Sequence, residues 1–356
     1  MPICFAEMNR KSLPARNIRA MVRYPGRYVR VVAAVLICAA ATACEASEPA
    51  SADTPASTSA KPPPPAPPDP AAVGADELGE VPILMYHQVT ADPAGEYDQS
   101  PAEFRAELDR LYREDYRPIT AAQYIAGDID IPAGTHPVVL TFDDSTGSQL
   151  RFTAEGVPTA DCAVGVLEGF AADHPDFPAR ATFYVNNNPF EADPRALPWL
   201  AEHGYEIGAH TANHPDLAGL DAAGVQRELA QNVRAITAAA PGTAVHTMAL
   251  PLGSAPVDPA LALAGTSDGT PYRFAAAMLV GANPAPSPFG PVDPAAVPRI
   301  RSGLGAVPFD SGYWLDLLAA EPERRYTSDG DPGRISFPRS SANRLDPRWS
   351  EQAHSY

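Results

Sequence analysis

Apolar residues along the chain gather in short runs that alternate with segments of helical spacing. The runs that predict strands are residues 81–89, 137–144, 179–187, 205–211, 245–251, 273–280 and 297–302. The segments that predict helices are residues 100–115, 160–174, 193–204, 221–239 and 310–321. Strand–helix alternation over this length predicts an α/β fold with a parallel sheet, either open or closed into a barrel. In such folds functional sites form at the carboxyl ends of the strands.

Residues 100–115 give a clear helix signal. Ser100 has the side chain of an N-cap, and Phe104, Leu108 and Leu111 fall on one face of the predicted helix.

The N-terminal residues 1–43 have the pattern of a secretory signal. Arg23, Arg27 and Arg30 precede an apolar run, residues 31–43, that is too short for a membrane span. Small residues lead into Cys44, an arrangement that resembles a bacterial lipobox, in which the cysteine is lipidated and becomes the new N-terminus. We therefore expect an exported protein anchored by lipid to the outer face of the cell membrane. The alternative is a cleaved signal without lipid and a secreted protein.

Residues 44–78 are rich in Pro, Ala and Ser and contain no aromatic residue. Such a segment buries too little apolar surface to fold, and its prolines favour a stiff, extended tether. The remaining residues, 79–356, show no second linker and no internal repeat, so we predict one domain near the upper size for a single core.

Charge and cysteine content narrow the class of protein. The chain has a formal net charge of −17, and residues 1–43 hold seven Lys and Arg against one Glu, so the exported part is more acidic still. An acidic surface argues against a nucleic-acid partner. Once the signal is removed and Cys44 serves as an anchor, Cys162 alone remains, so no disulfide framework is expected.

Chemistry-bearing residues stand at two predicted strand ends. "VVLTFDD" places Asp143 and Asp144 after a buried strand, where two adjacent carboxylates repel each other and call for a nearby cation. "YEIGAHTANH" places His210 and His214 four residues apart after another strand. Two imidazoles and one carboxylate suit a divalent metal such as Zn²⁺ with a position left for water. The alternatives are a turn or helix cap for the aspartates and a solvated loop for the histidines.

Together with "ALPLG" (249–253), these motifs resemble the polysaccharide deacetylase family, the NodB-homology carbohydrate esterases, over about residues 81–300. The "YH" at residues 86–87 resembles the branch of that family that acts on extracellular poly-N-acetylglucosamine. The resemblance implies an irregular (β/α) barrel and a hydrolase that removes acetyl groups from an acetylated polysaccharide of the cell wall or an extracellular polymer.

The resemblance also implies roles for individual residues. Asp144, His210 and His214 would bind the divalent metal, with Zn²⁺ expected. Asp143 would act as the general base on a water molecule, and the backbone N–H of Leu252 would stabilise the oxyanion.

The chain departs from the family pattern in two places. Ala249 stands where the third motif usually has an arginine that positions the base, and Arg299 or Arg301 is a candidate replacement from another strand. The family's late Leu-x-x-His motif, which supplies the general acid, is missing. We favour His87 as an active-site residue and candidate acid over a core histidine, and we expect His246 to be structural.

Three functions stay open at this point. The first is N-deacetylation of amino-sugar polymers, and the second is an O-acetyl esterase of the same family. The third is a non-catalytic carbohydrate-binding lipoprotein on a degenerate deacetylase fold, which the lost arginine and late histidine favour but the intact Asp and His pairs oppose. Residues 146–162 form an insertion after the Asp pair that we expect over the mouth of the site.

Overall fold

A computed structural model of the protein describes residues 68–281, 283–303 and 308–356. The predicted signal (1–43), Cys44 and most of the predicted tether lie outside the described residues. None of the helices in the described part combines the length and the apolar character that crossing a membrane requires.

A parallel sheet forms the centre of the fold. Its strands follow the order β11-β8-β7-β6-β5-β1-β12, and β4 pairs with β5. The strands are β1 (Ile83–Tyr86), β4 (Tyr116–Ile119), β5 (His136–Phe142), β6 (Thr182–Val185), β7 (Glu206–Ala209), β8 (Thr247–Ala249), β11 (Ala276–Met278) and β12 (Ile300–Arg301).

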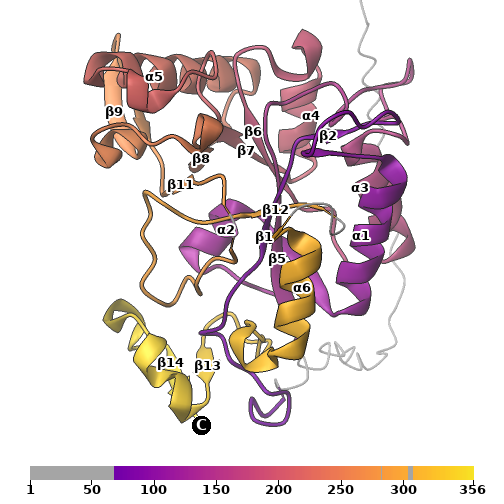
Figure 1. Cartoon of the computed structure of the whole chain (residues 1–356), viewed down its shortest axis with the longest axis vertical. Helices are drawn as coiled ribbons and strands as arrows, with labels where there is room; N and C mark the ends of the chain where they lie inside the picture. The colour runs from indigo at the N-terminus through magenta and orange to yellow at the C-terminus, as the bar shows by residue number, and fades with distance from the viewer. Residues whose placement is uncertain (1–67, 282, 304–307) are drawn as a thin grey trace, which may run out of the picture. The chain divides into compact units, whose positions relative to one another are not determined.

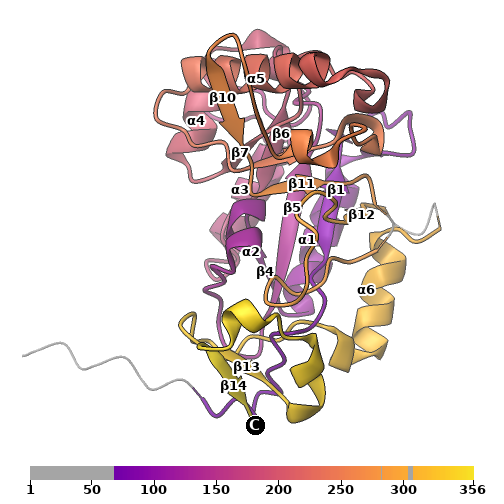
Figure 2. The same cartoon turned by 90° about the vertical axis from the view of Figure 1, so that its left-hand side faces the viewer.

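The two edges of this sheet approach each other. A parallel bridge joins Met278 at the end of β11 to Val297, three residues before β12. The sheet is therefore a parallel α/β half-barrel, as the strand–helix alternation and the family resemblance predicted (Figures 1 and 2).

Helices connect the strands and cover the sheet. They are α1 (Pro101–Arg113), α2 (Ala121–Ala126), α3 (Ala163–Asp173), α4 (Ala196–Glu202), α5 (Ala222–Ala239) and α6 (Ser311–Ala320). The signal predicted for α1 is confirmed: Ser100 caps the helix in a capping box with Glu103, and Phe104, Leu108 and Leu111 are buried. A similar cap, in which the Asp221 side chain accepts a hydrogen bond from Gly224 N, begins α5.

The structure adds elements that the sequence pattern did not reveal. Besides β4 and α2, these are β3 (Asp98–Gln99), β9 (Ala264–Ser267) with β10 (Thr270–Arg273), and β13 (Ile335–Phe337) with β14 (Ala353–Ser355); β3 pairs with β2 (Gln88–Val89), which lies within the predicted run 81–89. Each of these elements has six residues or fewer, which is too short for a period to stand out.

The period-two alternation of β5 separates its two faces. Val138, Leu140 and Phe142 join the larger apolar cluster with α1 and α3, whereas Val139 joins a second cluster on the concave face. Asp143, four residues beyond Val139, continues the alternation onto the concave face, which also holds the buried Arg299.

The folded unit begins slightly before the predicted boundary at residue 79. Ala75, Asp76, Glu77 and Leu78 are all buried, and Asp76 forms a bridge with Thr327. The first described residues therefore pack against the C-terminal segment that carries β13 and β14. In Figures 1 and 2 this segment lies at the opposite end of the folded unit from α5.

Candidate metal centre and active site

Three parallel strands of the half-barrel end at the same edge of the sheet, and each is followed by a candidate site residue. His87 follows β1, Asp143 and Asp144 follow β5, and His210 follows β7. These side chains surround a cavity of about 290 Å³. The residues that line it are His87, Tyr97, Asp143, Asp144, His210, His214, Leu250, Leu252 and Val280. The structure thus brings together all six residues predicted for the site.

Asp144, His210 and His214 form a compact donor set. The Oδ1 atom of Asp144 lies 3.3 Å from Nε2 of His210 and 3.3 Å from Nε2 of His214. The three donor atoms all lie within 4.8 Å of one another. Two imidazole nitrogens and a carboxylate oxygen at this spacing fit a divalent metal ion of the kind that nitrogen and oxygen ligands hold.

The orientation of His210 supports this fit. Its Nδ1 atom lies 2.9 Å from the backbone oxygen of Ala249, so Nδ1 carries the proton and Nε2 is left as the electron-pair donor. Its backbone N–H donates to Oδ1 of Asn232 at 3.0 Å. When Nε2 is protonated as well, it donates to Asp144; burial lowers the pKa of His210, but this bond and the two nearby carboxylates outweigh burial and raise it.

The backbone around the donor set is strained. Asp144 (φ 73°), Thr211 (φ 66°), His214 (φ 54°) and Leu252 (φ 58°) all adopt the left-handed region that residues other than glycine rarely occupy. Such conformations cost free energy and gather where tertiary structure must aim particular side chains. Here they turn the chain sharply after β5, β7 and β8.

Asp143 is held by a buried ion pair. Its two carboxylate oxygens accept hydrogen bonds from Nη1 and Nη2 of Arg299, both at 2.7 Å. The two side chains are 1% and 0% exposed. Burial alone would raise the pKa of Asp143, but the Arg299 guanidinium outweighs burial and holds that pKa well below its usual range. Asp143 is therefore ionised, and its position is fixed by a bidentate contact.

Of the two arginines that the sequence left open, Arg299 faces Asp143. Its Nε also donates to the backbone oxygen of Leu279, and Nη1 donates to the Thr141 hydroxyl. Arg301, on the other hand, pairs with Glu96 at 3.2 Å. Arg299 thus supplies, from the segment before β12, the guanidinium that the third motif lacks at Ala249.

His87 lines the cavity and is not part of the apolar core. Its ring lies near Asp143, Asp144 and His210, and burial lowers its pKa against the pull of the two carboxylates. Leu252 also lines the cavity, although its side chain is 67% exposed.

Sequence reasoning missed several residues that position the site. The Gln149 amide donates to the backbone oxygens of His87 and Asp143, and so ties together the ends of β1 and β5. Asn186 donates to the backbone oxygen of Asp144, and Glu228 accepts hydrogen bonds from Asn213 in the loop between the two histidines. What sets these residues apart is that the fold brings their amide or carboxylate groups to the strand ends. That placement cannot be read from a single sequence.

The insertion at residues 146–162 is placed differently from our expectation. None of its residues lines the cavity. Gln149 donates to backbone oxygens at the strand ends, and the ring of Phe152 packs against Trp199 of α4 with centroids 5.9 Å apart. The insertion therefore does not line the cavity but ties together the ends of β1 and β5 through Gln149.

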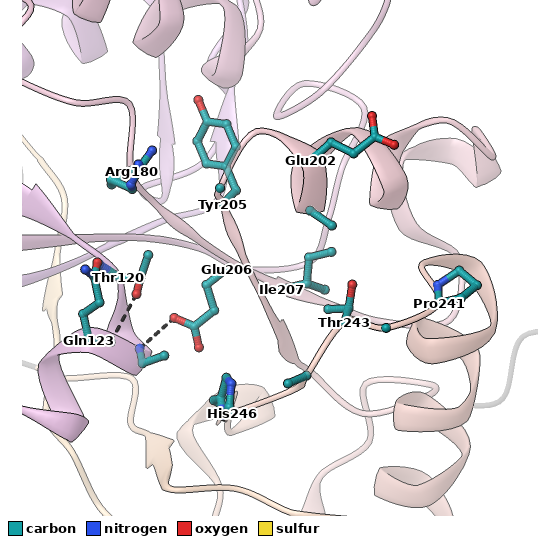
Figure 3. Close-up of a pocket in the computed structure, with 15 residues that line it drawn as sticks. Thr120, Gln123, Arg180, Glu202, Tyr205, Glu206, Ile207, Pro241, Thr243 and His246 are labelled. Atoms are coloured by element: carbon teal, nitrogen blue, oxygen red, sulfur yellow. Dashed lines mark hydrogen bonds between the residues drawn. The ribbon is translucent and has the colours of Figure 1, made fainter. Parts of the chain in front are cut away.

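A larger cavity of about 590 Å³ lies at the opposite, amino ends of the strands (Figure 3). Its buried carboxylate, Glu206, accepts hydrogen bonds from the hydroxyls of Thr182 and Thr247 and from the backbone N–H of Ala122. His246 also lines this cavity, away from the donor set. Because the Glu206 oxygens are already bonded within the fold, we place the functional site at the smaller cavity.

The parallel half-barrel thus presents an Asp-His-His donor set beside a buried, ionised aspartate. Residues 130–266 match the sequence profile of the family described as "Polysaccharide deacetylase". This segment of the protein is similar to that family, in line with the resemblance of its motifs.

Two curated relatives illustrate the match. The chitooligosaccharide deacetylase of Bradyrhizobium sp. (strain ANU 289) is 29% identical over 139 residues, which is 39% of this chain and 55% of the relative. The chitooligosaccharide deacetylase of Rhizobium leguminosarum bv. phaseoli is 36% identical over 103 residues, 28% of this chain and 43% of the relative. The chain spans about half the length of the curated relatives it matches.

Among solved structures, a polysaccharide deacetylase from Bacillus cereus is similar with a TM-score of 0.50. It is 21% identical, and the match covers 68% of each chain. This likeness supports the fold alone.

Proposed function

We propose that the protein is a metal-dependent hydrolase that removes acetyl groups from an N-acetylated amino-sugar polysaccharide of the cell wall or an extracellular polymer. The observation that carries the proposal is the pairing of a metal-type donor set, Asp144, His210 and His214, with a separate ionised carboxylate, Asp143, in one cavity. The names of the curated relatives and the family of residues 130–266 support the same reaction.

A divalent ion held by Asp144, His210 and His214, for which we propose Zn²⁺, would polarise the acetyl carbonyl and lower the pKa of a water molecule. Asp143 is placed to take the proton of that water as its oxygen bonds to the acetyl carbon. Both oxygens of Asp143 already accept hydrogen bonds from Arg299, but each keeps a second lone pair for this proton.

Two further residues complete the proposed reaction. The backbone N–H of Leu252 donates to the oxyanion that forms as the water oxygen adds. His87, once its ring carries a second proton, would give that proton to the amide nitrogen as the carbon–nitrogen bond breaks, which releases acetate and leaves a free amine on the sugar.

Arg299 argues against the non-catalytic alternative. That reading rested on the missing arginine and the missing late histidine. Arg299 now faces Asp143, and His87 lies in the cavity, so both missing groups have candidate replacements from other strands. A protein that only binds carbohydrate has no need for a bidentate pair that fixes a buried base.

The test is acetate release from N-acetylglucosamine oligomers and from acetylated xylan, with chelator, and after Zn²⁺ is restored. We expect release from the amino-sugar oligomers that stops with chelator and returns with metal. Release from xylan alone would assign the O-acetyl esterase, and no release from either substrate would assign a binding protein.

We also propose that the protein is exported and held at the outer face of the cell membrane by lipid on Cys44. The support is the sequence alone, in which a short apolar run ends in small residues before Cys44 and a Pro-rich segment follows. In Cys44→Ala the protein should move from the membrane to the soluble fraction. Unchanged fractionation would rule out this anchor.

A further inference from the structure

His87 lacks the contact that usually orients a functional imidazole. In most catalytic and ligating histidines, a hydrogen bond at the second ring nitrogen sets the tautomer and the ring orientation. The Nδ1 atom of His87 is buried, and no residue in the described part of the chain hydrogen-bonds it. Another contact must therefore hold the ring in the cavity.

The ring of Tyr97 is in a position to do so. Its centroid lies 4.7 Å from that of His87, with 45° between the ring planes. Both rings line the same cavity as Asp143 and Asp144. A ring contact of this kind stabilises one orientation of the imidazole by about 0.5–1.5 kcal/mol beyond the area it buries.

Tyr97 is itself held by contacts with neighbouring residues. The guanidinium carbon of Arg301 lies 5.1 Å from the Tyr97 ring centroid, and Arg301 pairs with Glu96 at 3.2 Å. The next residue, Asp98, begins β3 and accepts two backbone N–H groups of the loop that precedes it. The Tyr97 ring therefore contacts both the Arg301 guanidinium and the His87 imidazole.

We propose that Tyr97 is a positioning residue that sets the orientation of the His87 imidazole in the cavity, with Arg301 and Glu96 holding Tyr97 in place. The kinetic consequence of this inference rests on the proposed function, whereas the orientation of the ring does not. The competing role is a passive wall that only contacts the substrate.

The first experiment observes the His87 ring directly. Imidazole resonances are recorded by NMR in the wild type, Tyr97→Phe and Tyr97→Ala, and the His87 signal is assigned by its loss in His87→Ala. We expect Tyr97→Phe to keep the His87 resonance close to its wild-type position. Tyr97→Ala should shift or broaden it while the resonances of His210 and His214 stay in place. An unmoved His87 resonance in Tyr97→Ala overturns the proposal.

The second experiment is a double-mutant cycle on acetate release. Misplacement of one catalytic group by about 1 Å can cost roughly 10²-fold in rate, so Tyr97→Ala should lower kcat by about 10- to 100-fold with little change in KM. Tyr97→Phe should recover most of that loss. In a His87→Ala background, Tyr97→Ala should cost little more, because the group that it positions is gone.

Tyr313→Ala, an exposed aromatic on α6, serves as the matched control. The proposal fails if Tyr97→Ala raises KM and leaves kcat unchanged, or if its effect is fully additive with that of His87→Ala. Either result would mean that Tyr97 is a passive wall that only contacts the substrate. If the wild type releases no acetate, the proposed function fails, and the NMR result alone decides whether Tyr97 orients His87.

Discussion

The two adjacent aspartates lie in different environments within one cavity. Asp143 is fully buried against Arg299, whereas Asp144 is about one-third exposed and faces the two histidines. Burial raises the pKa of Asp144, but His210 outweighs burial and lowers it, so both carboxylates are ionised. This difference separates a candidate base from a candidate ligand.

Asparagine substitutions test that division. Asp143→Asn removes the proton acceptor but not a proposed ligand, so we expect metal to stay bound and turnover to fall about 10²–10⁴-fold. Asp144→Asn should lose metal and turnover together. Elemental analysis of the two purified variants, together with acetate release, decides the matter. Loss of metal from Asp143→Asn would mean that both carboxylates bind it.

The Arg299–Asp143 pair should also matter for stability. Arg299→Met leaves a buried carboxylate without its counter-charge, so we expect the free energy of unfolding to drop by about 3–5 kcal/mol in denaturant titrations. Arg301→Met is the matched control, because the Arg301–Glu96 pair is partly exposed and should be worth about 1 kcal/mol or less. Equal losses in the two variants would contradict a special role for Arg299.

At the scale of the elements, helix α5 organises the histidine loop. Asn232 is fully buried on α5, accepts the His210 N–H and donates to Asn187 after β6. One turn earlier, Glu228 accepts from the backbone and the side chain of Asn213. The helix therefore holds the loop that carries both histidines against the end of β7.

Removal of the Asn232 amide should loosen the donor set. Asn232→Ala leaves the His210 N–H without its acceptor, and we expect metal affinity to fall about 10- to 100-fold, as for other residues that orient ligands. Competition with a chromogenic chelator measures this affinity. Thr237→Ala, at an exposed position of the same helix, should leave it unchanged. Wild-type affinity in Asn232→Ala would show that the strand end alone fixes His210.

At the scale of the whole molecule, the first described residues pack against the C-terminal segment that carries β13 and β14. The Glu77 carboxylate is buried and accepts hydrogen bonds from Ser336 N, the Tyr326 hydroxyl and Asp329 N. Burial, together with the negative charge of Asp329, outweighs these hydrogen bonds and raises the pKa of Glu77 from 4.5 to about 8. The fold therefore favours the protonated form at this junction.

This pKa predicts a pH dependence of stability. Between pH 4.5 and about pH 8 the folded protein keeps a proton that the unfolded chain has released, so this contribution to stability is complete below pH 4.5 and is lost as the pH rises toward 8. Glu77→Gln cannot titrate, so its free energy of unfolding should fall less over this range. Over this pH range the change in free energy of unfolding should differ between the two proteins by a few kcal/mol at most. Denaturant titrations at several pH values measure it, and parallel slopes would contradict the assignment.

The sequence by itself determined the class of fold and the chemistry-bearing residues. Strand–helix alternation predicted the parallel α/β sheet, and the ends of the apolar runs placed His87, Asp143, Asp144 and His210 at strand ends, where the structure has them. These features are local, since period, capping and strand length are written in neighbouring residues.

Only the tertiary structure decided which distant residues meet. It selected Arg299 over Arg301 as the partner of Asp143, joined Gln149 to the strand ends and placed Tyr97 beside His87. These pairings depend on the order of strands in the sheet and on the path of loops between them. Alternation along a strand gives the face on which a side chain lies, but it does not give the neighbouring strand or the residue that faces it.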